Sequence, residues 1–134
     1  MRRGSEDIHL AVVGAHLSGQ PLNHQLVDEG AELIATTRTS PRYRLYRLEG
    51  GPPLRPALER VTDGGAAIEV EVWSIDAAGL GHVVAAVAPP LGIGSLELED
   101  GRWVTGFICE PHGLADALDI THHRSWRTYL ATLA

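Results

Sequence analysis

Apolar and polar residues alternate most regularly over residues 68–75 of this chain. Ile68, Val70 and Val72 alternate there with Glu69, Glu71 and Trp73. A period of two places successive side chains on opposite faces of a strand, so this segment predicts a strand with one buried and one solvated face. Shorter apolar segments predict further strands at residues 8–14, 32–37, 43–48 and 57–61.

Turn residues predict how neighbouring strands connect. The segment Thr39-Ser40-Pro41 predicts a turn that pairs residues 32–37 with residues 43–48. Asp100-Gly101 is typical of a tight hairpin turn and predicts pairing of residues 96–98 with residues 103–108. Hairpin connections therefore outnumber crossovers in the predicted sheet.

Helices are few and short in the predicted structure. Asn23 is a favourable N-cap for a helix that ends at Gly30, and Asp76 caps a second helix that continues to about Val87. Two shorter helices are predicted at residues 114–118 and 125–133. We therefore expect an α+β fold with a mixed, mainly antiparallel, barrel-like sheet and a few short helices. Residues 8–134 would form a single domain behind a disordered leader of residues 1–7.

Charge and composition narrow the classes of function. All 11 basic side chains are arginine, and 17 acidic residues give a formal charge of −6. An acidic chain argues against nucleic-acid binding, and no apolar segment approaches the ~20 residues that span a membrane. A single cysteine, Cys109, is typical of a reducing compartment, so we expect a cytoplasmic protein. Without lysine, Schiff-base chemistry, a phosphate-binding P-loop and a Ser–Lys pair are excluded.

The segment Gly14-Ala15-His16-Leu17 is the first candidate for chemistry. It follows a predicted strand, where backbone N–H groups can hold an anion and a glycine lets a ligand approach the main chain. Histidine has an ordinary pKa near 6.5, so His16 can act as acid or base at neutral pH. The alternative interpretation is a tight turn with a surface histidine.

Charged residues on two predicted strands are further candidates. Strand alternation over residues 38–47 places Arg42 and Arg44 on the opposite face from Tyr43. One arginine facing inward would suit a carboxylate, whereas the alternative is a solvated edge strand. Glu69 and Glu71 are secondary candidates for acid–base work if their face lines a pocket, and otherwise lie on the solvated face of the sheet or pair with these arginines.

The sequence contains only weak patterns for a metal site or a nucleophilic cysteine. His122 and His123 are adjacent and would point apart, and no His-x-His or His-Glu-x-x-His pattern occurs. Cys109 follows apolar residues and is predicted to be an inert thiol, while Glu110 and His112 follow it and would rim a site. We therefore expect no metal and no cofactor.

Five segments, taken together, resemble the C-terminal domain of allophanate hydrolase. The resemblance runs from about Ile8 to Ala131, and the segments occur in the same order as in that family. They read AVVGAHLSGQPLN at residues 11–23, TTRTSPRYRLY at 36–46, GAAIEVEVW at 65–73, PPLGIGSLE at 89–97 and GFICEP at 106–111.

This resemblance implies a fold like that of the γ-glutamylcyclotransferases, whose Tyr-Gly-Ser-Leu-type loop binds substrate through its backbone. The corresponding residues 13–17 lack the tyrosine and the serine, and residues 89–94, where the cyclotransferase glutamate would fall, contain no acid. Both departures argue against cyclotransferase activity. In allophanate hydrolase an N-terminal amidase domain with a Ser–Ser–Lys triad releases the first ammonia, and the C-terminal domain is linked to loss of carbon dioxide from N-carboxycarbamate. A chain without lysine cannot contain that triad.

The leading hypothesis is a domain that binds a small dicarboxylate and assists decarboxylation of N-carboxycarbamate to ammonia and carbon dioxide. His16 is the predicted proton donor. The predicted substrate-binding residues are Gly14, Ala15, Leu17, Asn23, Arg42, Tyr43, Gly92, Ile93, Gly94 and Glu110, with Arg38 as a further cation. One alternative is a non-catalytic module that binds a separately encoded amidase or forms a homodimer. Another is a cyclotransferase acting on a different γ-glutamyl compound, which would require Glu69 or Glu71 in the pocket.

Overall fold

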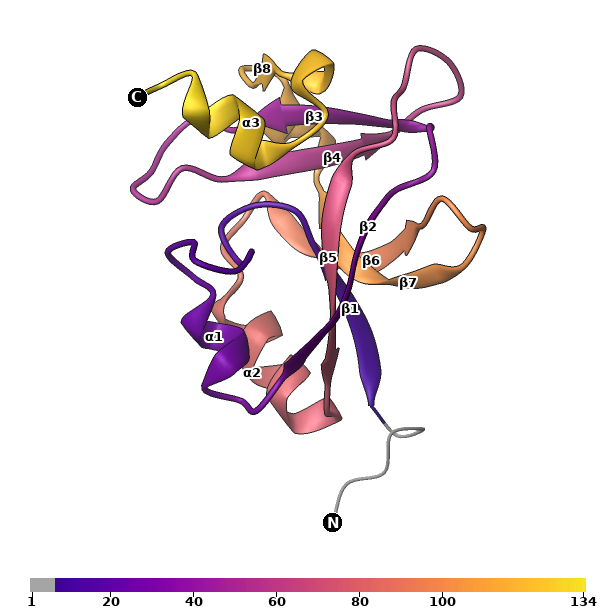
Figure 1. Ribbon diagram of the computed structural model, residues 1–134. Helices are drawn as coiled ribbons and strands as arrows, with labels where there is room; N and C mark the ends of the chain where they lie inside the picture. The colour runs from indigo at the N-terminus through magenta and orange to yellow at the C-terminus, as the bar shows by residue number, and fades with distance from the viewer. Residues whose placement is uncertain (1–6) are drawn as a thin grey trace.

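A computed structural model describes residues 7–134, so residues 1–6 of the predicted leader lie outside the described residues. Asp7 accepts a hydrogen bond from the Ser74 hydroxyl, with 2.8 Å between the oxygens. The strands are β1 (Ile8–Val12), β2 (Glu32–Arg38), β3 (Tyr43–Arg47), β4 (Pro56–Arg60), β5 (Glu69–Ile75), β6 (Leu91–Glu97), β7 (Trp103–Cys109) and β8 (Leu118–Asp119) (Figure 1). The helices are α1 (His24–Val27), α2 (Ala77–Ala86) and α3 (Trp126–Ala131).

The strands form two sheets with mainly antiparallel pairing. The larger has the order β2-β5-β1-β7-β6 and the smaller has the order β4-β3-β8. Only the pairing of β1 with β7 is parallel among the described strands. Beyond β2, the Ser40 N–H donates to the Glu97 carbonyl and the Glu99 N–H donates to the Arg38 carbonyl, so the larger sheet closes on itself. The predicted mixed, mainly antiparallel, barrel-like α+β fold is therefore confirmed.

The predicted pairing of residues 32–37 with residues 43–48 is wrong. Strand β2 pairs with β5, whereas β3 pairs with β4 and β8. The reason lies in Thr39, whose N–H donates to the Ile68 carbonyl and whose hydroxyl accepts from the Ile68 N–H. These bonds hold Thr39 beside Ile68, where the chain leaves the larger sheet. Figure 1 shows the chain passing from the upper end of β2 to β3 of the smaller sheet.

The central strand β5 is buried on both faces rather than on one. Val70 and Val72 lie in the core as predicted, but Glu71 and Trp73 on the other face are each only 6% exposed. The predicted solvated face is therefore wrong for these two residues, because other elements cover it. The largest fully buried side chains of the core are Trp126, Leu10, Leu17, Leu26, Leu45, Ile68, Ile75, Leu98 and Ile120.

Local signals fixed some helix ends and not others. The Asp76 carboxylate caps α2 by accepting from the Gly79 N–H, as predicted. Asn23 precedes α1 but makes no side-chain cap, because its amide donates to the His16 carbonyl instead. The helix predicted at residues 114–118 is replaced by a single 3-10 turn at Pro111–Leu114. The predicted hairpin is confirmed, with β6 paired to β7.

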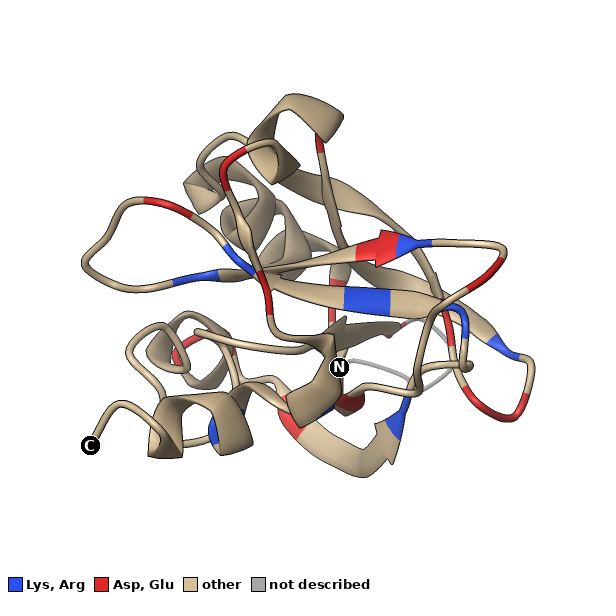
Figure 2. Cartoon of the chain, turned by 90° about the horizontal axis from the view of Figure 1, so that it is seen from above, with Lys and Arg blue, Asp and Glu red and all other residues tan. Residues whose placement is uncertain are grey.

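Acidic and basic positions are interspersed over the strands and loops, without a basic face in the view of Figure 2. Within residues 7–134, no helix has the length and apolar character needed to cross a bilayer.

Candidate functional site

The loop that leaves β1 places His16 in the interior. The Leu17 N–H donates to the Gly14 carbonyl and the Leu22 N–H donates to the Ala15 carbonyl, which folds residues 14–22 into consecutive turns. The Asn23 amide donates to the His16 carbonyl, with 2.9 Å between nitrogen and oxygen. His16 is therefore held through its backbone before its side chain makes any contact.

The His16 imidazole is 9% exposed and has two partners. Its Nε2 lies 2.8 Å from Oε1 of Gln25 in α1, and its ring stacks on Phe107 of β7 with 4.9 Å between centroids. Burial lowers the pKa of His16 below its ordinary value, and the nearby His24 acts in the same direction. The bond to Gln25 opposes this shift only in part.

A hollow of about 370 Å³ opens beside this imidazole, in the size range of small-molecule sites. We call it the His16 hollow, together with a smaller recess that adjoins it at Gly14 and Ala15. Both parts are lined by His16, Leu22, Arg55, Leu91 and Phe107. The larger part extends over residues 51–53 and 86–88, and none of the described lining residues is acidic.

Arg55 provides the positive charge of the His16 hollow. Its Nη1 donates to the Ala88 carbonyl at 3.1 Å and its Nη2 donates to the Pro89 carbonyl at 3.4 Å. No carboxylate within residues 7–134 forms an ion pair with it. A guanidinium carries five N–H donors, so donors remain for an anion. Sequence reasoning missed Arg55 because it follows a Gly-Pro-rich loop, outside the arginine-rich segment; its flanking prolines were the available signal.

Two residues that line the recess have backbone N–H groups without an acceptor among the described residues. Within the described part of the chain, the N–H groups of Ala15 and His16 have no hydrogen-bond acceptor. By contrast, the Leu17 N–H donates to the Gly14 carbonyl and the Ser18 N–H donates to the Glu71 carboxylate. Gly14 lines the recess, and a Cβ there would lie 2.1 Å from Cγ of Pro56. The proline ring therefore occupies the space that the glycine leaves.

Arg42, which directly precedes β3, and Tyr43, the first residue of β3, do not line the His16 hollow. Arg42 is exposed, and its carbonyl accepts from the Val61 N–H. Tyr43 is buried, its hydroxyl accepts from the Glu97 N–H, and it lines a separate hollow of about 180 Å³ that also contains Cys109. Desolvation raises the pKa of Tyr43. Arg38 lines a third hollow with Glu69 and Arg124.

Of the other predicted substrate-binding residues, some lie at the His16 hollow and others lie elsewhere. Ala15 lines the recess, while Leu17 is buried in the core. Gly92, Ile93 and Gly94 belong to β6, where the preceding Leu91 is the lining residue. The Glu110 side chain is 63% exposed and lies 3.9 Å from that of His112.

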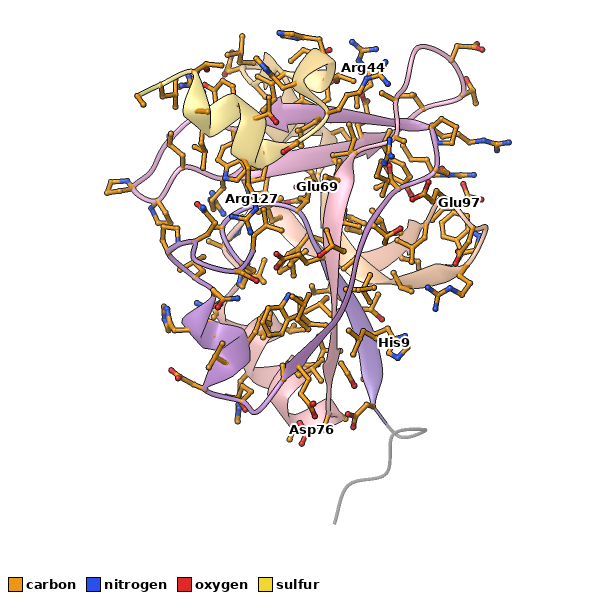
Figure 3. All side chains as sticks on the ribbon, viewed as in Figure 1. His9, Arg44, Glu69, Asp76, Glu97 and Arg127 are labelled. Atoms are coloured by element: carbon orange, nitrogen blue, oxygen red, sulfur yellow. The ribbon has the colours of Figure 1, made fainter. Side chains whose placement is uncertain are left out.

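The two candidate glutamates of β5 have different surroundings. Glu71 accepts from the N–H and the hydroxyl of Ser18, from Nε1 of Trp73 and from Nη2 of Arg127. Glu69 lies at the upper end of β5 (Figure 3). Neither lines the His16 hollow, and the suggested pairing with Arg42 or Arg44 is wrong for Arg44, which pairs with Asp119.

Other chemistry finds little support in the described residues. Residues 7–134 contain no group of three His, Cys, Asp or Glu side chains placed to hold a metal ion. The Cys109 thiol is partly exposed and donates to the Glu110 carbonyl, and burial raises its pKa. A raised pKa keeps the thiol protonated and weakens it as a nucleophile.

Comparison with known proteins gives consistent matches. A family model for the allophanate hydrolase C-terminal domain matches residues 8–131. Urea amidolyase of Saccharomyces cerevisiae is 46% identical over 133 residues, which are 96% of this chain and 7% of the yeast protein. Selenomethionine-substituted allophanate hydrolase of Kluyveromyces lactis has a TM-score of 0.92 at 43% identity, over 96% of this chain and 22% of that one. A protein specific to uropathogenic E. coli has a TM-score of 0.87 at 30% identity, over 93% of this chain and 96% of that one.

Proposed function

This chain belongs to the allophanate hydrolase C-terminal domain family, and from that membership we propose that it binds a small dicarboxylate and assists the decarboxylation of N-carboxycarbamate. The observation that carries the proposal is the composition of the His16 hollow. Arg55, His16 and Ala15 line it; within residues 7–134 the N–H groups of Ala15 and His16 have no acceptor, and no carboxylate lines the hollow. Such a site attracts a compact dianion.

The proposed reaction needs a proton at nitrogen. When the C–N bond of N-carboxycarbamate breaks, one carboxylate leaves as carbon dioxide and the bonding electrons remain on nitrogen. One proton taken up there gives carbamate, and a second loss of carbon dioxide with a second proton gives ammonia. His16 is the proposed donor, and Arg55 with the N–H groups of Ala15 and His16 would hold the carboxylates. Arg55 takes the part that the sequence suggested for Arg42.

The alternative cyclotransferase function has less support. The fold is the γ-glutamylcyclotransferase-like fold implied by the sequence, but that reaction requires an acidic residue in the pocket. The two candidates, Glu69 and Glu71, lie outside the His16 hollow.

A dianion probe tests the binding step. Malonate has two carboxylates at the spacing of N-carboxycarbamate, and we expect isothermal titration calorimetry to detect its binding. Replacing Arg55 by glutamine should weaken binding about 10–100-fold, because charge-assisted hydrogen bonds contribute about 1.5–3 kcal/mol. Arg42→Gln is the matched control and should leave the affinity unchanged. Equal losses in both variants would indicate a general charge effect and overturn the assignment of Arg55.

Binding of the dianion should be coupled to protonation of His16. Burial lowers the pKa of His16 in the free protein, and a bound dianion favours the imidazolium and raises it. Between these two pKa values binding takes up a proton, so the affinity falls as the pH rises through that interval. Calorimetry in buffers of different ionisation enthalpy would measure this uptake. His16→Gln should abolish it, and an unchanged uptake in that variant would contradict the coupling.

A partner protein is the second proposal, and the relatives supply its support. The chain spans 7% of the yeast urea amidolyase, so the equivalent region lies within a much larger chain there. We propose a separately encoded amidase as partner in the cytoplasm, and the alternative partner is a second copy of this domain. Co-purification with an amidase that is unaffected by His16→Ala, together with absent decarboxylation, would favour a non-catalytic assembly module.

A further inference from the structure

The environment of His16 distinguishes its two ring nitrogens. Nε2 lies 2.8 Å from Oε1 of Gln25, and a carboxamide oxygen accepts hydrogen bonds but donates none. With the Gln25 oxygen facing it, Nε2 carries the hydrogen of this bond. Within residues 7–134, no protein group lies within hydrogen-bonding distance of Nδ1.

Three contacts hold the His16 ring, the His16 backbone and Gln25 in this arrangement. The face of the ring packs on Phe107, with 25° between the two planes. The His16 backbone is tied to Asn23, two residues before Gln25 in the chain. The Gln25 N–H donates to the Leu22 carbonyl at 3.0 Å, which anchors Gln25 at the start of α1.

We propose that Gln25 is a positioning residue that keeps a proton on Nε2 of His16, so that Nδ1 is the atom that takes up and delivers the proton in the His16 hollow. The role of Nδ1 in proton transfer rests on the proposed function, whereas the tautomer of His16 can be tested without a ligand. The neutral ring has its proton on Nε2 alone, and the imidazolium has protons on both nitrogens. Only the Nδ1 proton is then available for transfer, because Gln25 retains the other.

A carboxamide suits this role because it does not titrate. The charged and titratable groups near the ring are Arg55, which lines the same hollow, and His24, which follows Asn23. Burial and His24 lower the pKa of His16, and Gln25 accepts from Nε2 without adding a negative charge. The lowered pKa favours the neutral ring in the empty site, and a bound dianion would favour its protonation.

Nitrogen NMR of the uniformly ¹⁵N-labelled full chain tests the assignment without a ligand. Above the pKa of His16, we expect its Nε2 to resonate as a protonated nitrogen and its Nδ1 as an unprotonated one. His24 provides an internal reference in the same spectrum, because its Nδ1 lies 3.0 Å from the Pro21 carbonyl and must donate to it. The two histidines should therefore show opposite tautomers. A proton on Nδ1 of neutral His16 would overturn the proposal.

Two variants of Gln25 separate positioning from mere packing. Gln25→Leu should give a mixture of tautomers at His16, and retention of a single Nε2–H tautomer would overturn the proposal. Gln25→Glu still accepts from Nε2, so it should restore the single tautomer and raise the pKa of His16. If Gln25→Leu does not fold, the spectra of the wild type and of Gln25→Glu still show whether neutral His16 carries its proton on Nε2. Loss of malonate binding with an intact tautomer would instead overturn the proposed function alone.

Discussion

Replacement of His16 by alanine is expected to remove the acceleration of carbon dioxide release from N-carboxycarbamate. General acid catalysis by one positioned side chain contributes about 10²–10⁴-fold to a rate, and His16 is the titratable group that lines the His16 hollow beside Arg55. The variant should retain the fold, because the backbone bonds of residues 14–22 do not involve the imidazole.

The measurement must separate enzymatic from spontaneous release. Carbamates lose carbon dioxide unaided in water, so the rate is taken as the excess over a protein-free reaction, with N-carboxycarbamate generated in place by an allophanate amidase. His82→Ala is the control, since His82 lies on α2 with its side chain 69% exposed and pairs with Glu29. Full activity in His16→Ala, or no excess rate in the wild type, would contradict a catalytic role.

The contrast between His16 and Arg55 shows what local sequence can and cannot predict about this site. His16 follows a recognisable strand and a glycine, so its segment was found from the pattern alone. Arg55 reaches the same hollow from a proline-rich loop about 40 residues later, where no periodic pattern indicates which way a side chain points. Its guanidinium donates to two backbone carbonyls of the segment that follows α2, more than 30 residues away in the sequence.

The fold divides in the same way. The cap at Asp76 and the hairpin of β6 and β7 were predicted because nearby residues determine them. The pairing of β2 with β5 was not predicted, because it depends on a hydrogen bond between Thr39 and Ile68, 29 residues away in the sequence. The alternation in β5 gave a strand correctly but not its burial, because a strand pattern does not reveal what covers the polar face.

The stability of the site loop is expected to depend strongly on Glu71. Glu71→Ala should lower the free energy of unfolding by about 2–5 kcal/mol, because each buried donor left without an acceptor costs about 1–3 kcal/mol, whereas the partly exposed Arg127 can be solvated. Ser18 would lose the acceptor of both its N–H and its hydroxyl, and the Trp73 indole would lose its acceptor in the interior. Ser18 lies two residues after His16, so the loss acts directly on the loop that forms the site.

Urea unfolding of matched variants would measure this effect. Glu69→Ala is the control, because Glu69 lies on the same strand, its side chain accepts no hydrogen bond within the described residues, and surface substitutions typically change stability by about 0.5 kcal/mol or less. Glu71→Gln should fall between the two, since an amide oxygen can accept from Ser18 and Trp73 but the amide nitrogen cannot accept from Arg127. Similar losses for both alanine variants would contradict the role of Glu71. A larger loss for Glu71→Ala would support a stabilising role of this carboxylate for the loop that carries His16.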